Sequence, residues 1–194
     1  SQGRPGALQE LALDVVVRDV ARLLQPLMPA DIVLSCRCAS ELPTISGDAV
    51  SAQQIVMNLC LNARDAQPRG GQVAVSLSHE VIAEARCASC HQRFGGAFVV
   101  LAVSDAGPGI DPQVVARIFD PFFTTKREAD TTTTRATLRG SEGGSGLGLS
   151  VVHGAIHQMG GHVTVGGADG GGTRFAVYFP CRAACASCEE AASG

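Results

Sequence analysis

Apolar residues recur at helical spacing in three parts of the chain. The first part covers 15–28 and ends at Pro26 and Pro29, because proline cannot continue a helix. The second part runs over 51–66 and stops at a Pro-Arg-Gly-Gly cluster, and the third covers 146–160. This spacing predicts three helices, and a shorter one is expected over 112–119.

Alternating or continuous apolar runs between these segments predict strands. The runs cover 8–13, 31–39, 72–82, 97–104, 161–167 and 172–180. We expect a cysteine-containing loop over 83–96 and an irregular loop over 124–145, which is either a functional lid or disordered. The resulting order predicts an α/β (α+β) two-layer sandwich with a mixed, mostly antiparallel sheet and its helices on one face. The domain would occupy 8–180, between a frayed start at 1–7 and a cysteine-bearing tail at 181–194.

Composition narrows the possible partners of this domain. Charged residues make up 17% of the chain and the formal net charge is −3, so a polyelectrolyte such as duplex DNA is not an expected ligand. The chain has no apolar run of about 20 residues and no signal-peptide pattern, and we therefore expect a cytosolic domain without direct membrane contact. Lys126 is the single lysine in an arginine-rich chain, which makes this position a candidate for a specific role.

Two glycine-rich segments have the character of ligand-binding turns. Asp105 follows a buried strand and precedes Gly107 and Gly109, whose lack of Cβ lets a flat ligand approach the backbone. A buried carboxylate only accepts hydrogen bonds, so Asp105 suits an exocyclic amine. The second segment, 143–148, precedes a helix whose free N–H groups suit phosphate. Each segment alone could be an ordinary turn, but the two together favour a nucleotide site.

Polar residues also share one face of the helix predicted over 51–66. Asn58, Asn62 and Asp65 are spaced by four and three residues, and apolar residues flank them. Amide oxygens are good ligands for Mg²⁺, which accompanies nucleotide phosphates. A solvated helix face is the alternative interpretation.

Five motifs in order make the chain resemble the catalytic ATP-binding domain of a sensor histidine kinase, closest to the nitrogen-regulation type. This family belongs to the superfamily that includes gyrase, a heat-shock chaperone and mismatch-repair ATPases. The motifs are QIVMNLCLNARDAQP, SDAGPGI, IFDPFFTTK, GSGLGLSVVHG and GGTRFAVYFP. The resemblance implies the ATPase-like fold of these kinases, with ATP and Mg²⁺ bound.

The resemblance also implies individual roles. Asp105 would accept from the adenine amine, Asn62 would bind Mg²⁺ with Asn58 beside it, and Lys126 would contact phosphate. Asn58, Asn62 and Lys126 are thus the candidate catalytic residues. The nucleotide-binding set comprises these three together with Asp65, Asp105, Gly107, Gly109, Ile110, Phe119, Gly144, Ser145, Gly146, Leu147, Gly148, Leu149 and Thr173.

The expected reaction is transfer of the ATP γ-phosphate to a protein histidine. Hydrolytic members of the superfamily have Glu where this chain has Asn58, whose amide cannot take a proton at neutral pH. The phosphoacceptor histidine would lie on a separate domain of the same kinase. Through that domain the kinase would interact with a response regulator, and the parent protein is expected to be a homodimer. A superfamily ATPase, a protein-serine kinase of the anti-sigma-factor type and a zinc-stapled interaction module are the alternatives.

Cysteines form two identical C-A-S-C units, at Cys87 and Cys90 and at Cys185 and Cys188. Two such pairs suit a four-thiolate zinc site if the final strand runs antiparallel beside 97–104, which would bring both pairs to one end of the sheet. Ordinary reduced thiols are the alternative. Haem attachment through Cys87, Cys90 and His91 is disfavoured, because the second unit lacks the histidine.

Overall fold

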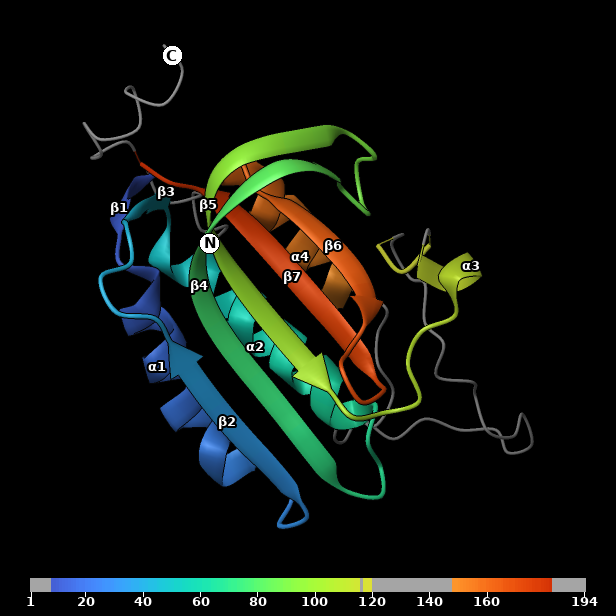
Figure 1. Ribbon diagram of the computed structural model, residues 1–194. Helices are drawn as coiled ribbons and strands as arrows, with labels where there is room; N and C mark the ends of the chain where they lie inside the picture. Colours follow the sequence, from blue (N-terminus) through green and yellow to red (C-terminus); the bar gives the residue numbers. More distant parts are fainter. Residues whose placement is uncertain (1–7, 116, 120–147, 183–194) are drawn as a thin grey trace, which may run out of the picture.

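The computed structural model describes residues 8–115, 117–119 and 148–182. Five strands form one sheet in the order β2-β4-β5-β7-β6, in which only the β2–β4 pair is parallel. Helices α1, α2 and α4 cover one face of this sheet (Figure 1). The predicted two-layer α/β sandwich with a mostly antiparallel sheet is therefore confirmed. The strands of the sheet are Ile32–Cys38, Gly71–Arg86, Arg93–Asp105, His162–Gly167 and Thr173–Pro180, for β2, β4, β5, β6 and β7.

The helices form where the apolar spacing predicts them. Helix α1 spans Leu13–Leu24 and is followed by the short 3₁₀ turn Gln25–Leu27. Helix α2 spans Ala49–Asp65, and its N-cap Asp48 accepts a hydrogen bond of 2.9 Å from the Ser51 N–H, which satisfies a free donor at the helix start. Helix α4 spans Gly148–Gln158.

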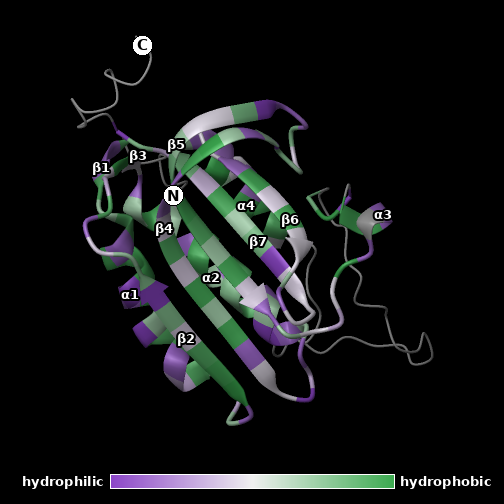
Figure 2. Cartoon of the chain, in the orientation of Figure 1, coloured by the Kyte–Doolittle hydropathy of each residue, from purple (hydrophilic) through white to green (hydrophobic). Residues whose placement is uncertain are grey.

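A single core lies between the helices and the sheet. The continuous apolar run of β5 is buried from Phe98 to Val103, as expected for a central strand. Hydrophobic residues dominate the middle strands in Figure 2, whereas α1 carries polar residues on its outer side. The buried residues of α2 are Ala52, Ile55, Val56, Leu59, Cys60 and Ala63.

Three local predictions were wrong. Residues 83–96 are mostly a β-hairpin arm rather than a loop, because the β4–β5 ladder continues past an irregularity between Ile82 and Ala85 and leaves only 87–92 as the tip. In Figure 1 this arm arches over the sheet beside the ends of β7 and β6. The second error is the missed strand β3 (Ile45–Gly47), which pairs with β1 (Gln9–Leu11) in a separate small sheet. The third is helix α3, which covers only Pro112–Val115 and gives way to a turn.

No helix among the described ranges is both long enough and apolar enough to cross a membrane.

Candidate functional site

Asp105 is the buried carboxylate at the end of β5, with 7% of its surface exposed. Its Oδ1 atom accepts hydrogen bonds from the N–H groups of Gly107 (2.8 Å) and Thr173 (3.2 Å). Thr173 begins β7, which pairs with β5, so sheet pairing brings together two predicted site residues that are far apart in the sequence. These two donors orient the carboxylate and leave its second oxygen able to accept from a ligand.

Glycine is required where the chain folds closely around Asp105. Gly109 has a φ of +81°, and a Cβ on Gly107 would lie 2.9 Å from the Ala66 carbonyl oxygen. Gly172 has a φ of +89°, and its Cβ would collide with the carbonyl oxygen of Asp105. These positions let two loops pass close to the end of β5, as a site for a flat ring requires.

Gln67 is a positioning residue that sequence reasoning missed. Its side chain is 4% exposed, and its Oε1 atom accepts from the N–H groups of Gln72 (2.9 Å) and Ala106 (3.2 Å). Its Nε2 atom donates to the carbonyl oxygens of Ala63 and Gln72, each at 3.0 Å. Gln67 thus ties the end of α2 and the start of β4 to the loop after Asp105. The only sequence signal for this role was the position of the glutamine just after the predicted helix, and a glutamine is also common at an ordinary helix end.

The two asparagines of α2 have different surroundings. A Cβ on Gly148 would come 3.9 Å from the Asn58 Oδ1 atom, so the Asn58 amide faces the helix start that follows the second glycine-rich segment. The buried Nδ2 atom of Asn62 has no hydrogen-bond partner among the described residues. Such an unengaged amide is costly unless a ligand uses it, and the amide oxygen is of the type that Mg²⁺ prefers. These side chains therefore fit a magnesium–phosphate group.

The remaining predicted site residues differ in their exposure to solvent, and some lie outside the described residues. Asp65 is exposed and pairs with Arg64, with a side-chain N···O distance of 2.8 Å. Phe119 is buried, whereas Ile110 and Leu149 are half-buried. Several predictions lie outside the described residues, namely those for Lys126, Gly144, Ser145, Gly146, Leu147, Cys185, Cys188 and the lid at 124–145.

Cys87 and Cys90 meet a histidine within the described part of the chain. One ligand atom from each of Cys87, Cys90 and His162 lies within 4.8 Å of the other two. Burial raises the pKa of the Cys87 thiol, but N–H donors from Cys90, Val163 and Ser89 and the Ser89 hydroxyl outweigh it and lower this pKa to about 6. The pKa of the nearby His157 is also lowered, by burial and then by His153 and His162. The condition that β7 runs antiparallel beside β5 is confirmed.

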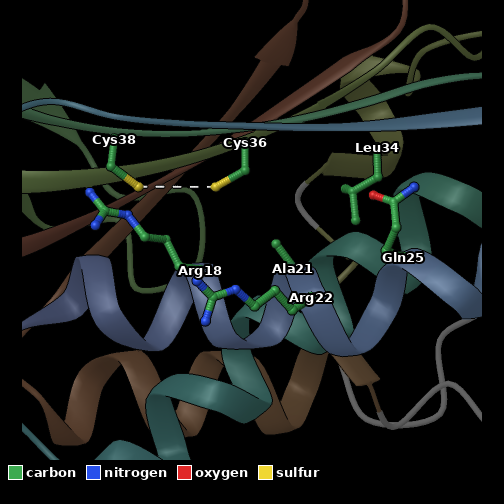
Figure 3. A pocket seen from close by; sticks show the side chains of 7 residues that line it. All are labelled: Arg18, Ala21, Arg22, Gln25, Leu34, Cys36 and Cys38. Carbon is green, nitrogen blue, oxygen red and sulfur yellow. Dashed lines mark hydrogen bonds between the residues drawn. The ribbon is translucent and has the colours of Figure 1, made fainter.

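A separate hollow of 430 Å³ lies between α1 and β2. Figure 3 shows Arg18 of α1 extending toward Cys38 of β2, while Arg22 lies along the helix. The sulfur atoms of Cys36 and Cys38 are 4.0 Å apart. Burial, with the neighbouring Cys38 thiol, raises the pKa of Cys36 to about 11. Cys36 is therefore a protonated, weakly nucleophilic thiol at neutral pH. The hollow shares no lining residue with the site around Asp105.

The family described as "Histidine kinase-, DNA gyrase B-, and HSP90-like ATPase" matches residues 47–183, which include the end of β5 and both asparagines. The chain belongs to this family. Its relatives include the sensor kinase CckA of Brucella abortus, 36% identical over 172 residues, with 88% of this chain and 17% of CckA covered. The sensor histidine kinase ZraS of Escherichia coli K12 is 31% identical over 90% of this chain and 31% of its own length. The chain thus spans less than a third of each of these relatives.

Two solved structures are similar to this chain. Full-length ShkA in complex with AMPPNP is 29% identical, with a TM-score of 0.67 and coverage of 96% of this chain and 33% of ShkA. The mycobacterial sensor histidine kinase MprB has a TM-score of 0.67 and 23% identity, over 91% of this chain and 99% of that one. The likeness to MprB concerns the fold alone.

Proposed function

We propose that this chain is the catalytic part of a two-component sensor kinase and transfers the ATP γ-phosphate to a histidine on an acceptor domain. The observation that carries this proposal is the fixed carboxylate of Asp105. Its Oδ1 atom accepts from two backbone donors, and Gly107, Gly109 and Gly172 let the backbone fold closely around the end of β5. Such an acceptor matches the exocyclic amine of adenine. ShkA, which is similar to this chain, was solved in complex with AMPPNP, which supports a nucleotide as the ligand.

Magnesium is the expected companion of the nucleotide. Asn62 would hold it through its amide oxygen. The unpartnered Nδ2 atom of Asn62 would then be free to donate to a phosphate oxygen. Asn58 would lie beside it and faces the start of α4. When bound, the ion would neutralise phosphate charge. In the reaction, this chain would orient adenine at one end of the site and phosphate at the other. Lys126 and the backbones of Gly146, Leu147 and Gly148 are proposed to contact phosphate.

Phosphoryl transfer to a protein fits the site better than hydrolysis. Asn58 lies beside the proposed magnesium site, and its amide cannot accept a proton from water at neutral pH. Transfer between two protein-held groups needs mainly positioning and charge neutralisation, which the site supplies without a base. The acceptor histidine would come from another domain of the same kinase, and the phosphate would pass on to a response regulator. We expect the parent kinase to be a homodimer with this domain in the cytoplasm, where ATP is available.

The test is a transfer assay with radiolabelled ATP, Mg²⁺ and the acceptor domain of the parent kinase. We expect acid-labile, base-stable phosphate on the acceptor histidine, and its loss with Asn62→Ala. Gln53→Ala is the matched control, because Gln53 is an exposed amide on the same helix. Rapid release of inorganic phosphate without the acceptor would instead identify an ATPase.

A further inference from the structure

The tip of the β4–β5 hairpin carries Cys87 and Cys90 and contacts the open edge of the sheet. Strand β6 is this edge, and it bonds to β7 on its other side. The Ala88 N–H donates to the Val163 carbonyl oxygen at 2.7 Å, and the Val163 N–H donates to the Cys87 sulfur at 3.5 Å. The tip therefore has a defined place against β6 rather than projecting freely into solvent.

This contact gathers metal-binding atoms from two distant parts of the chain. The Cys90 sulfur lies 4.0 Å from the His162 Nδ1 atom, and these atoms and the Cys87 sulfur lie within 4.8 Å of one another. In a tetrahedral zinc site the ligand atoms are about 3.4 to 3.8 Å apart, as Zn–S and Zn–N distances require. A small inward movement of the side chains would reach this spacing.

Neighbouring groups hold the cluster in this arrangement. The His162 ring stacks on Phe94, with centroids 4.5 Å apart and an interplanar angle of 9°, which fixes its plane. Ser89 lies between the two cysteines, and its Oγ atom is 3.2 Å from the Cys87 sulfur. The same Oγ atom is 2.9 Å from the Nε2 atom of His157, in the last turn of α4, and the centroids of the His157 and His162 rings are 6.0 Å apart.

We propose that Cys87, Cys90 and His162 bind one Zn²⁺ ion, with His157 as the fourth ligand after it leaves Ser89. Two thiolates and two imidazoles are a common tetrahedral zinc set, and the spacings C-x₂-C and H-x₄-H fall within those of such sites. Soft sulfur ligands favour zinc over magnesium or calcium. The sequence led us to expect four thiolates, from Cys87, Cys90, Cys185 and Cys188. In the proposed site His162 and His157 take the places of Cys185 and Cys188, because the hairpin tip meets β6 and α4.

The ion would serve as a structural clamp. It would join the hairpin tip, the edge strand and the end of α4, which otherwise meet through few hydrogen bonds. Metal binding to a folded cluster of this kind adds to the free energy of unfolding. It would take no part in phosphoryl transfer, so its loss should leave ATP affinity unchanged.

The direct test is cobalt substitution in the whole chain, which uses no variant and therefore does not depend on a variant's folding. Metal-free protein is titrated with Co²⁺, and the absorption spectrum is recorded. We expect the intense visible bands of a tetrahedral site with thiolate-to-cobalt charge transfer, saturating at about one ion per chain, and their loss when Zn²⁺ is added. A weak octahedral spectrum would overturn the proposal.

Variants then identify the ligands through the zinc content of protein purified without chelator. Cys90→Ser and His162→Gln should each lower zinc from about one ion per chain to near zero. The double variant Cys36→Ser with Cys38→Ser is the matched control, because it removes two thiols of another strand and should retain zinc. Unchanged zinc in both ligand variants would overturn the site.

The fourth ligand is tested separately. His157→Gln should lower the zinc affinity, measured by competition with a chromophoric chelator. Loss of a group that only hydrogen-bonds to a metal ligand lowers affinity by about 10- to 100-fold, and loss of a ligand should cost at least as much. A double variant of Cys185→Ser with Cys188→Ser should bind zinc as the unchanged chain does. If the tail variant loses zinc and His157→Gln does not, the assignment of His157 is overturned.

Discussion

Replacement of Asp105 by asparagine tests the adenine site with almost no change of shape. The N–H groups of Gly107 and Thr173 both point at Oδ1, so the new side chain must place its carbonyl oxygen there to avoid two donor–donor contacts. Its NH₂ group then takes the place of the second carboxylate oxygen. A donor would face the exocyclic amine of adenine, which is also a donor.

The expected loss follows from this single reversed contact. A hydrogen bond to a charged group contributes about 1.5 to 3 kcal/mol, so Kd for ATP should rise about 10- to 150-fold. Inosine triphosphate carries a carbonyl oxygen where ATP has the amine, and this oxygen can accept from the new NH₂ group. Asp105→Asn should therefore reverse the preference and bind inosine triphosphate more tightly than ATP.

Calorimetric titration of both nucleotides into the unchanged chain and the variant measures this reversal. Asp111→Asn is the matched control, because exposed Asp111 likewise accepts from an N–H two residues ahead, that of Gln113, at 2.8 Å. It should leave both affinities nearly unchanged. The reasoning is refuted if Asp105→Asn keeps the ATP affinity, or if both variants weaken ATP equally.

Three further outcomes follow from the same site. Gln67→Leu removes four hydrogen bonds to backbone groups, one buried and three part-buried, and should lower the free energy of urea unfolding by about 3 kcal/mol, whereas exposed Gln72→Leu should cost little. Gly172→Ala should destabilise by at least about 1 kcal/mol more than Gly170→Ala, because both have a φ of +89° but only Gly172 lies against the backbone at the end of β5; equal melting temperatures would contradict this. The isolated chain should hydrolyse ATP slowly in a phosphate-release assay, because Asn58 supplies no base.

Local patterns predicted most of the fold, and long-range pairing explains the errors. The apolar run from Phe98 to Val103 identifies a central strand without knowledge of its neighbours. The arm is different, because its alternation is interrupted between Ile82 and Ala85 and it contains two glycines that resemble a loop. Its strand character depends on cross-strand pairing and on Phe94 packing against Tyr178, with ring centroids 5.0 Å apart. No local window contains this information.

In the site, too, local patterns were predictable and long-range contacts were not. Asp105 and its glycines were predictable, because a carboxylate after a buried strand and before glycines has a specific local chemistry. Gln67 was not, since its partners are backbone groups of three segments and leave no pattern of side chains. The meeting of Cys90 with His162 was equally hidden, because 72 residues separate them and only the contact of the hairpin tip with the edge strand β6 brings them together.

Sheet register also explains why the nucleotide site and the proposed zinc cluster should act independently. Asp105 pairs with Val73 at one end of the β4–β5 ladder, while Arg93 pairs with Arg86 beside the cysteine tip at the other. The arm arches back over the sheet (Figure 1), however, and His162 of the cluster pairs with Tyr178, which pairs with Val100 of β5, five residues from Asp105. At about 3.3 Å per residue along a strand and about 4.8 Å between strands, the two sites lie about 19 Å apart. Helix α4 is a shorter connection, but Gly148 and His157 are still about 14 Å apart along its axis. A metal at the tip can therefore stabilise the sheet edge without altering the hydrogen bonds that orient Asp105, because no described hydrogen-bond partner is common to the two sites.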